Sequence, residues 1–272
     1  MDINKLKELP PWEWPEDTGA TLLPLLQNAA ADPDDRLLAA SMAGDLSVVD
    51  DALAGALLAI VEETGADATL RARAAIALGP ALENADLMGF DEEEDVMISE
   101  GLFGAIQGVL KKCYRDAGCP KEVRRRCLEA SVRAPQEWHA AAIRSAYISG
   151  DPDWRLTAVF GMNYIEGFEK QIMESLEDDD PDIFYEAISA AGSWEVDAAW
   201  PRIVALVGDA DTEKELRLAA IESAVNIRPD DVGEILEPLL DEEDEDIVDA
   251  VHEALAMAEA MLEFDAEDDD EA

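Results

Sequence analysis

The sequence predicts an all-α fold, a solenoid of stacked antiparallel helix pairs, from two observations. Seven times along the 272 residues, a short acidic or polar turn opens a helix rich in Leu, Ile and Ala. Consecutive openings are mostly 29 to 35 residues apart, which is the recurrence expected of a stacked-repeat protein. The openings lie at Asp32, Asp67, Pro120, Asp151, Asp180, Thr212 and Glu245.

Residues 1–20 stand outside this recurrence. The segment Pro10–Pro15 is predicted to be non-helical, because prolines remove hydrogen-bond donors and restrict the residues before them. It carries Trp12 and Trp14, which need a surface to cover. We expect a cap over the open end of the first helix pair, since repeat arrays need one. An aromatic recognition strand for a partner is the alternative.

The repeats proper are predicted to form one solenoid over residues 21–264. After a helix near residues 21–30, each opening turn supplies a helix cap, as Asp32 does by accepting backbone N–H bonds ahead of Pro33. A second helix follows, as at residues 48–62, 198–207 and 232–240. Gly44, Gly79 and Gly192 are expected to end helices as left-handed residues.

Two segments depart from the regular period. The second full repeat is longer than the others, and the excess predicts an acidic insertion near residues 84–100, with an acidic loop at residues 91–95. At the other end, residues 245–262 are predicted to form a terminal helix. Residues 265–272 are too acidic to pack and are expected to be disordered.

The repeated helix resembles the HEAT-repeat family, in particular its short bacterial type, which is also found in phycobilin lyases. The best copy runs Asp67, Ala68, Thr69, Leu70, Arg71 and continues through Ala74-Ala75 to Leu78-Gly79. The fourth copy departs from the pattern, with Phe184 where Arg is expected. The resemblance implies a right-handed, armadillo-type superhelix whose Arg-bearing helices line the concave side. It also implies protein binding rather than a particular activity.

Five of the predicted helices carry an arginine just after their opening turn. We expect these arginines to form a structural ladder of ion pairs with the turn Asp residues, with ligand binding as the less favoured alternative. The five are Arg36, Arg71, Arg124, Arg155 and Arg217.

Charge narrows the possible partners. The net charge is −44, which argues against direct nucleic-acid binding because phosphates would be repelled. Residues 111–133 nevertheless hold 8 of the 20 basic residues and only 3 acidic ones. We call this segment the basic island. It fits an acidic or phosphorylated peptide, because Arg pairs bidentately with such groups. Neutralisation by the acidic loop at residues 91–95 is an equally weighted explanation.

The family pattern places Arg125 and Arg126 in groove-facing positions, with Arg73 in the equivalent position one repeat earlier. Phe160 and Tyr185 hold equivalent positions farther along, and aromatic residues are frequent interface anchors. The candidate protein-binding residues are Arg73, Lys111, Lys112, Arg115, Arg124, Arg125, Arg126, Phe160 and Tyr185.

Other functional classes find little support in the residues. The three clustered cysteines, Cys113, Cys119 and Cys127, match no zinc spacing and are expected to be buried, inert thiols in a cytoplasmic protein. No apolar run reaches the roughly 20 residues that span a bilayer. The single pair His252-Glu253 does not match HEAT-like di-iron hydroxylases, which need four such pairs, and His139 is expected to be a satisfied packing residue.

The sequence therefore predicts a non-enzymatic protein-interaction scaffold without cofactor or metal. It would bind a peptide or protein in the concave groove. Two alternatives remain: an acidic decoy that captures a basic nucleic-acid-binding protein, and a lyase-like accessory protein that holds a small anionic ligand.

Overall fold

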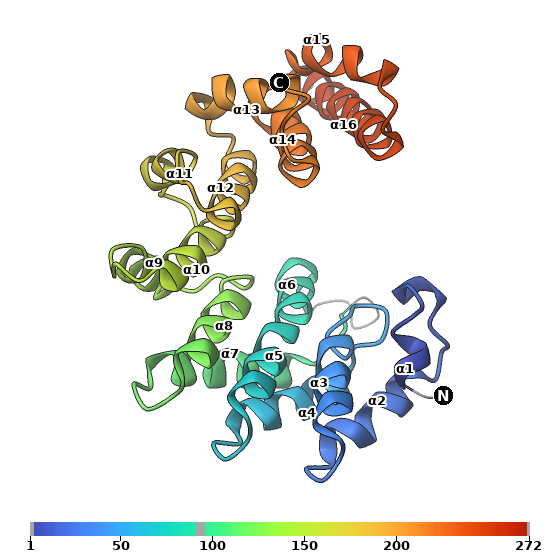
Figure 1. Ribbon diagram of the computed structural model, residues 1–272, viewed down its shortest axis with the longest axis vertical. Helices are drawn as coiled ribbons and strands as arrows, with labels where there is room; N and C mark the ends of the chain where they lie inside the picture. The colour runs from blue at the N-terminus through green and yellow to red at the C-terminus, as the bar shows by residue number, and fades with distance from the viewer. Residues whose placement is uncertain (1–2, 91–95, 271–272) are drawn as a thin grey trace. The chain divides into compact units, whose positions relative to one another are not determined.

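The computed structural model describes residues 3–90 and 96–270, with side chains as far as residue 263, and these residues form helices and no strand. The chain divides into two compact units, Met1–His139 and Ala140–Ala272. Each unit consists of helix pairs stacked side by side, as the solenoid prediction required (Figure 1). No described helix combines the length and the apolar character needed to cross a membrane.

In the first unit, two rows of helices pack against each other. Row A holds α3 (Pro33–Met42), α5 (Ala68–Ala77) and α8 (Lys121–Ser131), and row B holds α2 (Thr18–Gln27), α4 (Asp51–Glu62) and α7 (Glu100–Arg115). Each row B helix pairs with the row A helix that follows it. The N-terminal α1 (Ile3–Leu6) contacts α3.

The second unit repeats the arrangement. Its row A holds α10 (Pro152–Met162), α12 (Pro181–Ser193), α14 (Lys214–Ile227) and α16 (Glu245–Asp270). Its row B holds α11 (Glu169–Ser175), α13 (Trp200–Gly208) and α15 (Val232–Leu236), which is followed by a 3-10 turn, Glu237–Asp241. The short α9, His139–Tyr147, precedes α10.

The capping chemistry predicted from the sequence is confirmed at the four turns that begin with Asp. Asp32, Asp67, Asp151 and Asp180 each accept two backbone N–H bonds from the first turn of a row A helix. These bonds satisfy donors that no intrahelical carbonyl can reach, and the carboxylate complements the positive end of the helix. The α14 helix differs, because Glu213 rather than Thr212 occupies its N-cap position and the Glu213 side chain makes no capping hydrogen bond.

The arginines of row A are structural, but their main partners were not predicted. Arg36, Arg71, Arg124 and Arg217 each donate to a backbone carbonyl ten residues earlier, at N–O distances between 2.8 and 3.2 Å. In every case the acceptor is the penultimate residue of the preceding row B helix. The arginine at the fourth position of each of these row A helices therefore caps the C-terminal end of the row B helix before it, where the helix dipole is negative.

Part of the expected ion-pair ladder is also present. Arg217 binds Glu242 through both terminal nitrogens, at 2.6 and 2.8 Å, and Arg155 binds Asp178 at 2.8 Å. These carboxylates lie just before the opening turn of the next repeat, 25 and 23 residues along the chain. Arg155 does not cap a carbonyl like the others, since α9 ends one residue nearer to it in sequence.

The glycines predicted to be left-handed have a different role. Gly44, Gly79 and Gly192 have no positive φ, and a Cβ atom on any of them would collide with a neighbouring segment. At Gly192 it would lie 2.9 Å from the Ser223 Cα atom of the next row A helix. These glycines let successive repeats approach closely, so the expectation of helix-ending left-handed residues is wrong.

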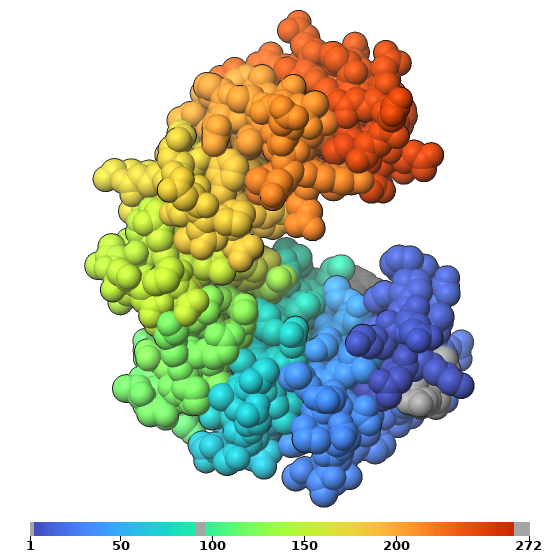
Figure 2. Space-filling model, in the orientation of Figure 1, coloured from blue at the N-terminus to red at the C-terminus, as the bar shows by residue number. Residues whose placement is uncertain are grey.

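The N-terminal segment packs against the first helices. Trp14 donates from Nε1 to the carbonyls of Leu6 and Leu9, at 3.1 Å each, and packs against the core. The prediction of a wholly non-helical segment is corrected by a 3-10 turn at Pro11–Glu13. Trp12 is 83% exposed and takes no part in the cap. Figure 2 shows this segment in dark blue against the helices that follow.

The insertion is organised differently from the expected loop. Helix α6 (Gly79–Met88) lies between α5 and α7 in sequence and contacts both of these helices as well as α8. The predicted acidic loop at residues 91–95 lies outside the described residues. At the C-terminus, α16 continues to Asp270, whereas the sequence predicted disorder from residue 265; residues 271 and 272 are not described.

Candidate functional site

The basic island spans the end of α7 and most of α8, and its α8 arginines are largely neutralised within that helix. Arg126 donates to Glu122 at 3.0 Å and to Glu129 at 2.6 Å. Arg125 lies 3.4 Å from Glu122 and 3.8 Å from Glu129 and is only 5% exposed. The prediction that Arg125 faces an open groove is therefore wrong, because its guanidinium is enclosed with its carboxylate partners.

Two more island arginines are used in packing. Arg124 donates to the Tyr114 carbonyl at 2.8 Å, and its guanidinium lies 5.8 Å from the centre of the Tyr114 ring. Arg133 pairs with Glu83 of α6. Helix α6 therefore supplies a carboxylate to the island, a function that the sequence had assigned to residues 91–95.

The remaining island cations lie on α7. Lys111 and Arg115 stand over the Trp138 ring, at 5.8 and 5.7 Å from its centre, and border a shallow opening of about 610 Å³. Lys112 is exposed on the same helix. Within the described part of the chain, none of these three cations forms an ion pair.

Arg73 is the other candidate cation that remains open. It is exposed on α5, without an ion pair to any described carboxylate, and shares a small depression with Arg126 and Glu122. The structure thus brings Arg73 next to Arg126 as the family pattern implied. Glu122 and Glu129 already neutralise Arg126, so this depression offers one available cation.

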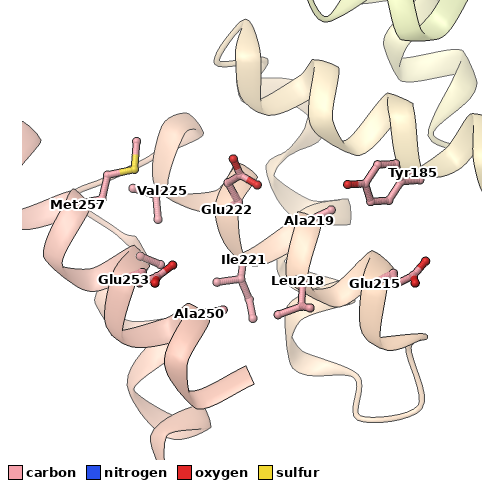
Figure 3. Close-up of a pocket in the computed structure, with 11 residues that line it drawn as sticks. Tyr185, Glu215, Leu218, Ala219, Ile221, Glu222, Val225, Ala250, Glu253 and Met257 are labelled. Carbon is pink, nitrogen blue, oxygen red and sulfur yellow. The ribbon is translucent and has the colours of Figure 1, made fainter. Parts of the chain in front are cut away.

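A groove of the second unit lies along α12, α14 and α16. It encloses about 450 Å³, and its floor includes Leu218, Ile221 and Val225 of α14. Figure 3 shows Tyr185 of α12 and Met257 of α16 on opposite sides of these residues. Tyr185 is 41% exposed and Met257 is 46% exposed, so the groove presents large apolar side chains to solvent.

Three exposed carboxylates border the groove: Glu215 and Glu222 on α14, and Glu253 on α16. No ion pair engages them among the described residues, and no Lys or Arg is among the described residues that line the groove. The pKa of Tyr185 is raised, first by burial and then by the negative charges of Glu186, Glu222 and Glu215. The groove therefore combines an apolar floor with a negative rim.

The aromatic candidates separate in the structure. Tyr185 lines the groove. Phe160 is half-buried on α10, where its ring lies 5.5 Å from that of Tyr164, and it does not line the groove. Phe184, which replaces the repeat arginine, is buried with Arg202 over its ring at 5.1 Å.

The histidines and carboxylates do not assemble a metal site in the part of the chain that the structure describes. His139 is fully buried, accepting from the Gln136 backbone N–H at 2.9 Å through Nδ1, while its Nε2 lies 3.1 Å from Ser131 Oγ. It is a satisfied packing residue, as predicted. His252 is exposed on α16.

The groove carboxylates were missed at the sequence level, although a signal was present. Glu215, Leu218 and Glu222 follow one another at helical spacing, which puts acids and an apolar residue on one face of α14. In a chain with 64 acidic residues that pattern is not distinctive. Only the position of α16 beside this face makes it one wall of a groove.

Comparison with known proteins agrees with the helix-pair stacking. Residues 169–256 match the HEAT-repeat family profile, over a stretch that includes α12, α14 and most of the groove. The matched stretch covers α12 and α14 and reaches into α16, and it supports the HEAT-repeat assignment made from the repeat signature for these residues.

Three solved structures show only a distant similarity to this chain. An engineered protein shares 18% identity, with a TM-score of 0.42, covering 75% of this chain and 96% of its own. Human deoxyhypusine hydroxylase in complex with glycerol shares 16% identity, with a TM-score of 0.41, covering 90% and 97%. A second engineered protein shares 16% identity, with a TM-score of 0.42, covering 88% and 78%. No curated protein matches the chain.

Proposed function

We propose that this protein is a non-enzymatic interaction scaffold whose HEAT repeats bind a positively charged, amphipathic segment of a partner protein. The observation that carries the proposal is the groove along α12, α14 and α16, with its exposed apolar residues between three unpaired carboxylates. An amphipathic helix with basic residues flanking its apolar face is complementary to that surface.

The energetics favour a few anchors over the general charge. Tyr185 and Met257 offer apolar area on the two sides of the groove, and desolvated aromatic and apolar anchors carry most of an interface's binding energy. The carboxylates would select a basic partner and speed its association. This preference for a basic partner agrees with the alternative in which the acidic protein captures a basic nucleic-acid-binding protein. A basic nucleic-acid-binding protein is therefore the partner class that we propose.

The test uses a defined peptide rather than captured proteins. A fluorescent amphipathic peptide of Leu and Lys should bind the full chain, as measured by anisotropy, whereas the same peptide with Glu in place of every Lys should not. Met257→Ala should weaken binding about tenfold, equivalent to about 1.4 kcal/mol, because it removes one side of the apolar surface.

A net charge of −44 will attract any basic peptide, so a matched control is essential. The double variant Glu222→Gln, Glu253→Gln should weaken binding about tenfold. Glu166→Gln with Glu177→Gln makes the same change of charge at exposed acids outside the groove and should have less than a twofold effect. Equal losses in both double variants would show that binding is general charge attraction, and the groove assignment would fail.

A second candidate site rests on the open α7 cations. Lys111, Lys112 and Arg115, beside Trp138, would accept an acidic or phosphorylated segment. A Glu-rich or phosphorylated peptide that binds wild type, but not the variant Lys112→Glu with Arg115→Glu, would support this site. Arg125→Glu is a poor probe, because Arg125 is buried among its own carboxylate partners.

A further inference from the structure

Three thiols and one guanidinium gather where α7 ends and α8 begins. Cys113 is on the last turn of α7, Cys119 is in the connecting loop and Cys127 is on α8. The Sγ atoms of Cys113 and Cys119 are 2.9 Å apart. An S–S bond is about 2.05 Å long, so the two sulfur atoms need to move together by less than about 1 Å to be joined.

Arg71 of α5 is held against this cluster. Its guanidinium donates to the Val61 carbonyl at 3.0 and 2.9 Å, and its Nη2 also lies 3.7 Å from Cys119 Sγ. The same interactions that make Arg71 a structural residue therefore place a fixed positive charge beside the thiols. A positive charge favours the thiolate form, which is the nucleophilic form of cysteine.

Cys113 is the thiol best suited to react first. It is the least buried of the three, whereas Cys127 has no exposed surface. The pKa of Cys113 is lowered to about 6, mainly by a hydrogen bond with Cys127. The hydrogen bond with Cys119 and the positive charge of Arg71 also lower the pKa of Cys113, whereas burial and the negative charge of Asp116 raise it. Burial raises the pKa of Cys119 to about 11, with Cys113 as a further cause.

We propose that Cys113 and Cys119 form a dithiol site that small hydroperoxides oxidise to an intramolecular disulfide. The Cys113 thiolate attacks one oxygen of hydrogen peroxide, the O–O bond breaks, and the hydroxide released takes a proton to give water. The Cys113 sulfenic acid is then attacked by the Cys119 sulfur. The S–O bond breaks, and its hydroxyl leaves as water with the Cys119 proton. Two electrons pass from the two thiols to one peroxide, which yields one disulfide and two waters.

The loop favours Cys119 over Cys127 as the resolving thiol. Cys119 follows Gly118 in a turn closed by hydrogen bonds from the Gly118 and Cys119 N–H groups to Asp116, so a short movement of this turn brings the sulfur atoms together. Cys127 also hydrogen-bonds to Cys113, but it belongs to the packed core of α8, so forming an S–S bond with Cys113 would require that helix to move. The sequence-based expectation of inert thiols did not include this contact.

Tryptic mapping of the wild-type chain tests the proposal directly, because each cysteine falls in a separate peptide. These are residues 113–115, 116–121 and 127–133. The reduced protein is treated with a small excess of hydrogen peroxide at pH 7, alkylated and digested. We expect an intact mass lower by two hydrogens and a disulfide joining peptides 113–115 and 116–121. A link to peptide 127–133, or three alkylated cysteines, would overturn the proposal.

Two comparisons separate native geometry from sequence proximity. Formation of the Cys113–Cys119 link should be at least tenfold slower in urea-unfolded protein at the same pH, and an equal rate would also overturn the proposal. Cys127→Ser should still form the link. Cys119→Ser should instead accumulate a Cys113 sulfenic acid that dimedone traps, provided that circular dichroism shows the variant folded; the wild-type mapping does not depend on that variant.

Discussion

At the scale of single residues, His139 shows how burial in the first unit changes the protonation of a histidine. Both ring nitrogens have partners within the same unit, and the Trp138 ring lies 4.1 Å from the imidazole, centre to centre. Burial, with the positive charge of Lys111 as a second cause, lowers the pKa of His139 to about 4. The folded protein therefore holds the imidazole neutral well below the pH at which an exposed histidine would gain a proton.

This gives a pH prediction with a defined sign. Between about pH 6.5 and 4 the unfolded chain binds a proton at His139 that the folded chain does not. The contribution of the neutral His139 to the free energy of unfolding is therefore fully present above pH 6.5 and is lost as the pH falls towards 4. We expect wild type to lose about 2–3 kcal/mol more unfolding free energy over this range than His139→Gln. Urea titrations at several pH values measure it.

The variant is the necessary control, because many carboxylates begin to protonate near pH 4 in both proteins. Their effects cancel in the difference between wild type and His139→Gln. Parallel losses of unfolding free energy in the two proteins would mean that His139 binds its proton equally well in the folded state.

At the scale of helices, arginine joins successive elements. The guanidinium on the fourth residue of a row A helix closes the last turn of the row B helix before it. A helix end otherwise leaves its final carbonyls without partners, which is costly when they are buried. The recurrent arginine is thus a connector between the two helices of a pair.

Replacing one connector should destabilise the second unit measurably. Arg217→Met would leave the Val207 carbonyl and Glu242 without their cation, and we expect a loss of about 2–4 kcal/mol in unfolding free energy. Lys170→Met removes the same charge from an 82% exposed side chain and should cost less than about 0.5 kcal/mol. Chemical denaturation measures the unfolding free energy of both variants. Similar losses in Arg217→Met and Lys170→Met would show that Arg217 does not stabilise the fold by capping.

At the scale of the whole molecule, net charge is the dominant quantity. A charge of −44 opposes compaction, and the distance over which the charges repel depends on salt. The screening length falls from about 30 Å at 0.01 M to about 3 Å at 1 M ionic strength. Screened charges still pair locally, as Glu122, Glu129 and Glu83 do with the basic island.

We therefore expect the thermal unfolding midpoint to rise as sodium chloride increases from 0.01 M and to level off near 0.3 M, measured by circular dichroism. Levelling distinguishes charge screening from exclusion of salt from the protein surface, which would continue to raise the midpoint at higher concentrations. A midpoint that does not change below 0.3 M would show that repulsion contributes little to stability.

Much of the architecture could be predicted from residues close together in the chain. The Asp caps and the starts of the row A helices depend on side chains and N–H groups two or three residues apart, and these predictions are confirmed. Helix α6 could not be predicted in this way, because the period shows only that residues have been added. The exposure of the candidate residues could not be predicted either, because it depends on which helices pack together. Tyr185 lines a groove, whereas Arg125 is buried.

By itself, the sequence determined that this protein is a stack of capped helix pairs, because caps and apolar periodicity are local properties of the chain. The tertiary structure decided which charges remain available. Arg71, Arg133 and Arg217 are engaged by groups ten to fifty residues away, whereas Glu222 and Glu253 have no ion-pair partner among the described residues and lie beside an apolar surface. Pairing and exposure depend on which helices lie side by side, and that information is absent from any one repeat.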